Sequence, residues 1–147
     1  MLCKRKLQVK FKKLHSDAKT PTKHLDAACF DLYSIQDCFI RPSTAVTVHT
    51  GIALEIPIGF AGFIHTRSGM GINHGLRVHL GVIDPDFRGE VSVHIFSHSS
   101  NIGTYELLEG DRVAQIFFAP ILPVELIEAV ELSETVRGEN CHGSSGR

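Results

Sequence analysis

Short runs in which apolar and polar residues alternate constrain the fold of this chain more than any other feature. Val91, Val93 and Ile95 occupy every second position of one run, and Val46 and Val48 do the same in another. Because successive side chains of a β-strand point to opposite faces of the sheet, this period predicts strands that are buried on one face.

Turn-forming residues separate these runs at short intervals. They lie at positions 41–43, 57–59, 67–69, 84–86 and 109–111. Many short strands between closely spaced turns predict an all-β fold, an antiparallel sandwich or jelly roll. Segments 68–74 and 124–132 could each hold a short helix. At 147 residues the chain predicts one domain that can bury a core without disulfides or a metal.

Charge and apolar content exclude several classes of protein. The formal net charge is −1, which predicts no general attraction to nucleic acid or anionic membranes. No apolar run approaches the ~18 residues of a membrane span. Seven Lys and Arg residues crowd the first twenty positions. We interpret them as a solvated edge, with a nucleic-acid or targeting tail as the alternative.

The four cysteines (Cys3, Cys29, Cys38 and Cys141) lie far apart, without the paired spacing of a metal site. We interpret them as reduced thiols. The basic N-terminus is not followed by an apolar stretch, so no secretory signal is predicted. We therefore expect an intracellular protein, cytoplasmic or nuclear, with no membrane partner and no stable nucleic-acid partner.

Two clusters carry groups suited to polyphosphate chemistry. In residues 66–69, Arg67 offers a charged guanidinium group and Ser68 a hydroxyl. A helix starting near Ser68 would add main-chain amide donors. A capped turn is the alternative. In residues 81–89, an aliphatic strand delivers Asp84 to its end. Asp84 could serve as a general base or could cap the turn. The turn-capping role suits Asp86 better than Asp84.

Two further clusters lie near the end of the chain. Gln115 interrupts an apolar strand, and a buried amide needs hydrogen-bond partners. The preceding Asp111 and Arg112 could simply pair at the surface. Residues 137–147 are rich in Gly and Ser, which predicts either a frayed terminus or an arm that orders on a phosphate ligand.

In their order along the chain, these clusters and residues 26–34 resemble the five motifs of trimeric dUTP pyrophosphatases (dUTPases). The matches are residues 26–34 to A-G-x-D-L-Y-S, 66–69 to P-R-S-G, 81–91 to G-V-I-D-x-D-Y-R-G-x-V, 110–116 to G-D-R-I-A-Q-L and 137–146 to R-G-x-G-G-F-G-S-T-G. The resemblance implies a dUTPase-like jelly roll or distorted β-barrel over residues 1–136, with at most one short helix. Residues 137–147 would be a flexible arm that closes over the active site.

The resemblance also implies an activity. The chain would be a homotrimer with shared active sites that splits dUTP into dUMP and pyrophosphate with Mg²⁺. This reaction limits uracil in DNA and supplies dUMP for dTTP synthesis. Asp84 would activate the water that attacks the α-phosphorus. Mg²⁺ would be held by substrate phosphates and water rather than directly by the protein, with Asp31 near its water shell.

The resemblance assigns the substrate contacts residue by residue. Phosphate contacts would come from Arg67, Ser68 and Gly69, and Gln115 would contact a phosphate or a water. Main-chain groups of Leu80 and Gly81 would read uracil, and Phe87 would lie against the deoxyribose. From the arm, the contacts would be Arg137, Ser144 and Ser145 on the terminal phosphates, His142 stacked on the base, and Gly143.

The chain departs from the motifs at Cys29, Thr66, Phe87, Asn140, Cys141 and His142. Cys29 replaces a glycine, a residue that tolerates a positive φ where a cysteine would be strained, and Thr66 replaces a proline, which predicts a looser turn. None of these changes removes a chemical group that the mechanism requires. The alternatives are a catalytically weak dUTPase-like protein used for nucleotide binding or signalling, a dCTP deaminase of the same fold, and a purely structural jelly roll.

Overall fold

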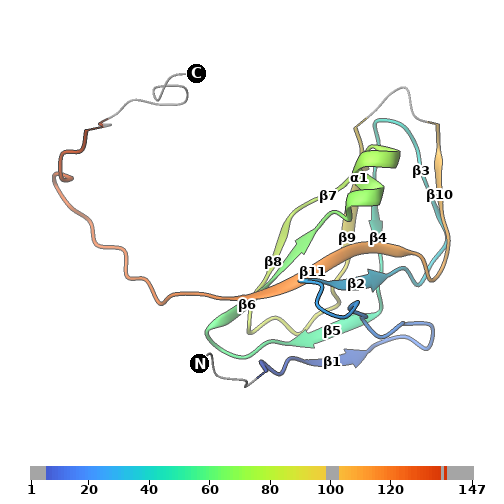
Figure 1. Cartoon of the computed structure of the whole chain (residues 1–147), viewed down its shortest axis with the longest axis horizontal. Helices are drawn as coiled ribbons and strands as arrows, with labels where there is room; N and C mark the ends of the chain where they lie inside the picture. Colours follow the sequence, from blue (N-terminus) through green and yellow to red (C-terminus); the bar gives the residue numbers. More distant parts are fainter. Residues whose placement is uncertain (1–5, 99–102, 137, 139–147) are drawn as a thin grey trace.

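The computed structural model of the chain describes residues 6–98, 103–136 and 138. This part contains eleven β-strands and one short helix, which confirms the predicted all-β fold (Figure 1). The elements are β1 (Lys10–Lys13), β2 (Phe30–Tyr33), β3 (Cys38–Ile40), β4 (Ala45–Val48), β5 (Ile52–Glu55), β6 (Phe60–His65), α1 (Ser68–His74), β7 (Leu76–Val78), β8 (Gly81–Ile83), β9 (Val93–Ser97), β10 (Tyr105–Leu107) and β11 (Arg112–Pro120).

The named strands pair antiparallel throughout. The largest sheet has the order β2-β11-β6-β8 and a second has the order β4-β9-β7, while β1 pairs with β5 and β10 with β3. In Figure 1, the long strand β11 crosses the body between β2 and β6. This central strand therefore brings side chains of β2 and β6, which are far apart in the sequence, to its two edges.

The predicted alternation is realised in the core. Val91, Val93 and Ile95 are buried, whereas Ser92 and His94 are exposed. The same core cluster contains residues of the four-stranded sheet, Leu32, Ile64, Val113 and Ile116. The two larger sheets thus bury their inner faces in one apolar core, as the alternating pattern requires.

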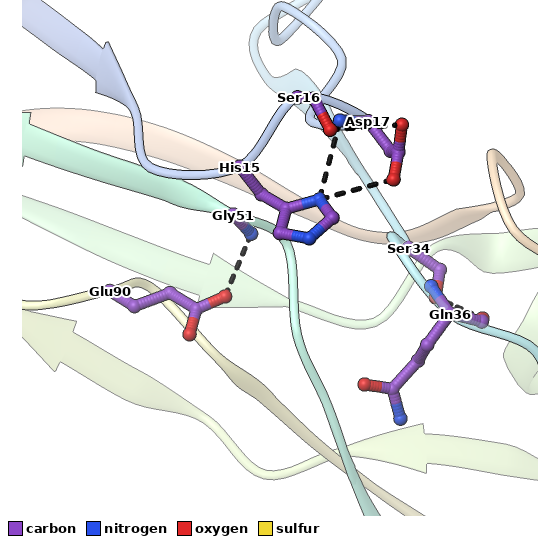
Figure 2. Close-up of polar contacts among 7 residues, drawn as sticks. All are labelled: His15, Ser16, Asp17, Ser34, Gln36, Gly51 and Glu90. Carbon is purple, nitrogen blue, oxygen red and sulfur yellow. Dashed lines mark hydrogen bonds and ion pairs between the residues drawn. The ribbon is translucent and has the colours of Figure 1, made fainter.

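Gly51 lies between β4 and β5, where its main chain contacts two other segments of the protein. Its φ of +65° favours glycine, and a Cβ there would lie 2.9 Å from the Cβ of Ala18. Its N–H donates to Oε1 of Glu90 at 2.7 Å (Figure 2), and its carbonyl accepts the N–H of Leu14 at 2.7 Å. The other Glu90 oxygen lies 2.8 Å from Nδ1 of His49. Partial burial raises the pKa of Glu90, but hydrogen bonds from Gly51 and His49 outweigh it, so the pKa is lowered overall.

Of the two segments that could hold a short helix, 124–132 forms none, which agrees with the expectation of at most one short helix. Residues 121–136 contain no helix or strand and extend away from the body (Figure 1). A helix this short needs a surface on which to bury its apolar face, and this segment has none within the described part of its own chain. Its apolar side chains are largely exposed: Leu122, Val124, Leu126, Ile127, Val130, Leu132 and Val136.

The described residues also bear on the cysteine and membrane predictions. Cys29 and Cys38 are free thiols, as predicted for these two, and Cys3 and Cys141 lie outside the described residues. Burial, followed by the neighbouring Asp37 carboxylate, raises the pKa of Cys38. Within residues 6–98, 103–136 and 138, no helix has the length and apolar character needed to span a membrane.

Candidate active site

Strand register places Asp31 beside Arg67. Asp31 of β2 lies opposite Gln115 of β11, and Gln115 lies opposite His65, the last residue of β6. Two residues beyond His65, Nε of Arg67 donates to Oδ1 of Asp31 at 2.8 Å, and both side chains are about a quarter exposed (27% and 23%). The register of three neighbouring strands therefore brings this ion pair together.

Arg112 adds a second cation to the same carboxylate. Its Nη1 lies 3.5 Å from Oδ2 of Asp31. Sequence reasoning missed this contact and suggested a surface pair between Asp111 and Arg112 instead. Asp111 has another role, since its Oδ2 accepts the N–H of Leu108 at 3.0 Å and fixes the turn before β11. The shift in β2–β11 register at residues 112–114 could not be predicted from local sequence.

Gln115 has the hydrogen-bond partner that its place in an apolar strand requires. Its Nε2 donates to the main-chain carbonyl of Thr66 at 3.1 Å. The hydroxyl of Thr66 in turn accepts the N–H of Val78 at 2.8 Å. Thr66 therefore ties its turn to β7 and β11, in contrast to the looser turn expected from the loss of proline. Asp31, Thr66, Arg67, Arg112 and Gln115 are called the Arg67 cluster below.

The turn after Arg67 opens into α1, as the sequence predicted. Arg67 has extended backbone angles and occupies the N-cap, and the helix ends at Gly75 with a left-handed φ of 60°. Met70 is buried and anchors the helix, whereas Ser68 and Gly69 are exposed beside Arg67. The hydroxyl of Ser68 and the first turn of the helix thus face solvent next to the guanidinium.

The predicted base-reading residues lie where β7 turns into β8. Leu80 is 62% exposed, and Gly81 begins β8 opposite Ile64 of β6. A cavity of about 380 Å³ is lined by Thr66, Arg77, Val78, His79, Leu80, Phe96 and His98. Leu80 therefore shares a cavity with Thr66 of the Arg67 cluster.

Asp84 follows β8 and begins a compact loop, residues 84–89, called the Asp84 loop below. Its carbonyl accepts the N–H of Phe87 at 3.2 Å, and Nη1 of Arg88 donates to the carbonyl of Pro85 at 2.7 Å. The ring of Phe87 lies over Gly89, where a Cβ would meet the ring at 2.6 Å. These contacts fix the loop, while Asp84 itself is exposed to solvent.

Within one protomer, the Asp84 loop and the Arg67 cluster lie toward opposite ends of β6. Ile83 is opposite Gly62, and Arg67 follows Gly62 by five residues. At a rise of ~3.3 Å per strand residue, these positions are roughly 16 Å apart along the strand. The structure therefore brings Asp31, Arg67 and Gln115 together with the neighbouring Ser68, but not with Asp84.

A dUTPase family profile matches residues 17–146 of the chain. The chain belongs to the dUTPase family. Curated relatives named deoxyuridine 5'-triphosphate nucleotidohydrolase include a protein of Nautilia profundicola, 40% identical over 144 residues that cover 96% of this chain and 100% of the relative. A Candida albicans protein with the same name is 41% identical over 132 residues, which cover 88% of this chain and 82% of the relative.

Solved dUTPase structures agree with the fold. The dUTPase of Staphylococcus bacteriophage 80alpha with dUPNHPP superposes with a TM-score of 0.88 at 26% identity, covering 95% of this chain and 99% of that chain. A variant of the dUTPase from phage phi11 of S. aureus gives a TM-score of 0.77 at 26% identity, covers 84% and 97% of the two chains, and is described with a structural Mg(II) ion. The likeness confirms the predicted jelly-roll-like β fold.

Two departures from the dUTPase motifs can be judged from the structure. Cys29 does not have a positive φ, since the non-glycine residues with positive φ in the described part of the chain are Leu25 and Ser43. The concern that a cysteine strains this position was therefore wrong. The predicted arm residues Arg137, His142, Gly143, Ser144 and Ser145 lie outside the described residues, as do Asn140 and Cys141.

Proposed function

We propose that this dUTPase-family chain hydrolyses dUTP to dUMP and pyrophosphate. The observation that carries the proposal is the prebuilt Arg67 cluster, in which a guanidinium is oriented by a carboxylate beside an exposed hydroxyl. Such a guanidinium offers a fork of donors that matches phosphate oxygens, and its orientation is settled before the substrate binds. The names of the curated relatives support dUTP as the nucleotide.

Asp84 acts as the general base. Its carboxylate accepts a proton from water as the water oxygen attacks the α-phosphorus, and the bond to the bridging oxygen of pyrophosphate breaks in line. Arg67 and Ser68 bind the phosphate oxygens on which negative charge accumulates. Asp31 holds Arg67 in place, and Gln115 holds the turn that carries Arg67 through the carbonyl of Thr66.

The donor set of the site fits Mg²⁺ bound through substrate and water. Mg²⁺ usually keeps several waters and is bound by one or two carboxylates together with substrate phosphates. Asp31 is the carboxylate placed to receive such a water, because each of its oxygens has a further lone pair. When bound, Mg²⁺ neutralises phosphate charge as pyrophosphate leaves.

Base and sugar selectivity fall to the residues around β7 and β8. Main-chain groups at Leu80 and Gly81 hydrogen-bond to uracil, and the binding pocket there is too narrow for the methyl group of thymine. Phe87 lies against the deoxyribose and excludes a ribose hydroxyl by crowding. The exposure of Leu80 and the packing of Phe87 on its own loop support these roles. The arm, residues 137–147, closes over the nucleotide and excludes water.

The active sites are shared between copies of the chain in a homotrimer. Because the Asp84 loop and the Arg67 cluster of one protomer lie roughly 16 Å apart along β6, we assign the base and the phosphates that it serves to different copies of the chain. The extended segment 121–136 also supports self-association, because its exposed apolar side chains can be buried on a neighbouring copy. The free thiols Cys29 and Cys38 support an intracellular compartment, cytoplasmic or nuclear.

Mixing two inactive variants tests the shared site. Trimers of Asp84→Asn or of Arg67→Ala alone should be inactive. After subunit exchange at equal amounts, about a quarter of the sites combine an intact Asp84 from one copy with an intact Arg67 from another. Activity should therefore recover to about a quarter of the parent rate. Activity no greater than the sum of the two variants would show that both residues serve one site from the same copy.

A substrate panel tests the reaction itself. Pyrophosphate release is measured from dUTP, dCTP, dTTP and UTP with Mg²⁺, with ammonia release from dCTP as a parallel assay. Rapid turnover of dUTP alone supports the proposal. Tight dUTP binding without turnover would instead favour the nucleotide-binding or signalling alternative, and ammonia release would favour a deaminase.

A further inference from the structure

Thr66 is hydrogen-bonded to two strands, β11 beside the Arg67 cluster and β7, which leads to Leu80. It lies between the end of β6 and Arg67, and its carbonyl accepts Nε2 of Gln115 at 3.1 Å. Its hydroxyl accepts the N–H of Val78 at 2.8 Å. One residue thus connects the turn that carries the phosphate-binding guanidinium to the strand that leads to Leu80.

The hydroxyl of Thr66 completes the open edge of β7. This strand lies at the edge of its sheet and pairs with β9 alone, Val78 being opposite Ile95. Val78 is buried, with 4% of its surface exposed, so its N–H needs an acceptor within the protein. The side chain of Thr66 supplies the acceptor that a further strand would otherwise provide.

The position of β7 determines where the base-reading main chain lies. Val78 precedes Leu80 by two residues, and Thr66, Val78 and Leu80 line the same cavity of about 380 Å³. A shift of Val78 away from Thr66 would move the peptide groups at the end of β7. Proline, the usual residue at this place in the motif that the chain resembles, has no hydroxyl, so this link depends on a threonine.

We propose that Thr66 is a positioning residue for base selectivity. Its hydroxyl holds the Val78 amide, and thereby the main chain at Leu80, in the place where a methyl group on the base is excluded. Its carbonyl holds Gln115 and keeps the turn before Arg67 in register with β11. The inference rests on the proposed function, because it assigns Thr66 a role in the dUTP reaction of the same site.

Thr66→Val tests the proposal, because it keeps the branched shape and the main-chain carbonyl but removes the acceptor for Val78. With a bond of typical strength lost, KM for dUTP should rise roughly fivefold to tenfold while kcat changes less than about threefold. The preference for dUTP over dTTP in kcat/KM should fall about tenfold. Thr66→Ser keeps the hydroxyl and should restore both values to within about threefold of the parent protein.

Thr44→Val is the matched control. The hydroxyl of Thr44 donates to the carbonyl of Arg41 at 2.8 Å in an exposed turn outside the site, so its removal should leave KM and selectivity unchanged. If Thr66→Val fails to fold, Thr66→Ala removes the same acceptor without placing a methyl group against the Val78 amide, and the same criteria apply.

Three results would overturn the inference. Folded Thr66→Val could keep the KM and the selectivity of a parent protein that turns over dUTP normally. This result would refute the role of Thr66 but not the proposed function. An equal loss of kcat/KM for dUTP and dTTP, not rescued by Thr66→Ser, would show a structural role without selectivity. Absence of dUTP turnover in the parent protein would refute the proposed function and this inference together.

Discussion

The Arg67 cluster and the Asp84 loop are built in opposite ways. In the cluster, Asp31 and Arg67 are partly buried and paired with each other, and Asp31 also contacts the exposed Arg112. In the loop, hydrogen bonds from Phe87 and Arg88 fix the main chain, while the Asp84 side chain is exposed. The cluster orients its charged groups, whereas the loop orients only the backbone that carries its carboxylate.

This difference fits the two chemical tasks that we propose for these residues. A guanidinium that binds phosphate works best when its direction is fixed before the substrate arrives. A carboxylate that must take a proton from water needs free lone pairs, which an ion pair would occupy. Arg67 and Asp84 lie toward opposite ends of β6, so these two side chains do not pair within one protomer.

The largest expected effect is on the loop. Asp84→Asn removes the proton acceptor from an exposed position, so kcat should fall about 10³-fold while the melting temperature stays unchanged. Asp86→Asn, two residues along the same loop, should keep activity within about threefold. Initial rates of pyrophosphate release and thermal unfolding measure both. A rate above a tenth of the parent in Asp84→Asn would remove Asp84 from the role of base.

A change in the cluster should affect activity and stability together. Asp31→Asn removes the charge that faces Arg67 and Arg112, so kcat/KM should fall about 10²-fold and the free energy of unfolding by about 1–2 kcal/mol. Asp17→Asn is the control, since Asp17 contacts His15 at 3.2 Å outside the site. Loss of activity without loss of stability would mean that the cluster is not prebuilt by its ion pair.

The packing of the loop is tested at Gly89. A methyl group there would overlap the Phe87 ring, so Gly89→Ala should displace the ring and lower the preference for dUTP over UTP by roughly tenfold. The ring is on the surface, so stability should change by less than about 0.5 kcal/mol. Gly103→Ala, where nothing lies within 4 Å of the added methyl group, is the control. If the selectivity of Gly89→Ala were unchanged, the Phe87 ring would have no role in sugar recognition.

The smallest effect is expected at Glu90, which anchors the chain just after the loop. Its pKa is lowered in the folded protein from an ordinary value of 4.5. A lowered pKa contributes stability that is present above the unfolded value and is lost as pH falls through the folded value. Glu90→Gln should therefore cost about 1 kcal/mol at pH 7 and reduce the loss of stability between about pH 5 and pH 3. Urea unfolding measures this change, with Glu106→Gln as the control. If Glu90→Gln lost stability at acidic pH as steeply as the parent protein, the contacts to Gly51 and His49 would not favour the charged form of Glu90.

Much of the fold could be predicted because its signals are local. The alternation at residues 91–95 predicted which side chains are buried, and the residues at 67–69 predicted the start of α1. The sequence allowed a helix at 68–74 or at 124–132 but did not decide between them, because a period of apolar residues does not say whether a surface exists to bury them. The contact between Arg112 and Asp31 was missed for a similar reason, since it depends on a register shift between β2 and β11.

By itself, the sequence determined the class of fold, the family motifs and the residue types that could carry phosphate chemistry, because each depends on composition and order within short segments. The tertiary structure decided which of these residues meet. It joined Asp31 to Arg67 across two strands, gave Thr66 a partner in β7 and separated Asp84 from both. The physical reason is that strand pairing and register, which the core selects as a whole, bring together residues that no local pattern connects.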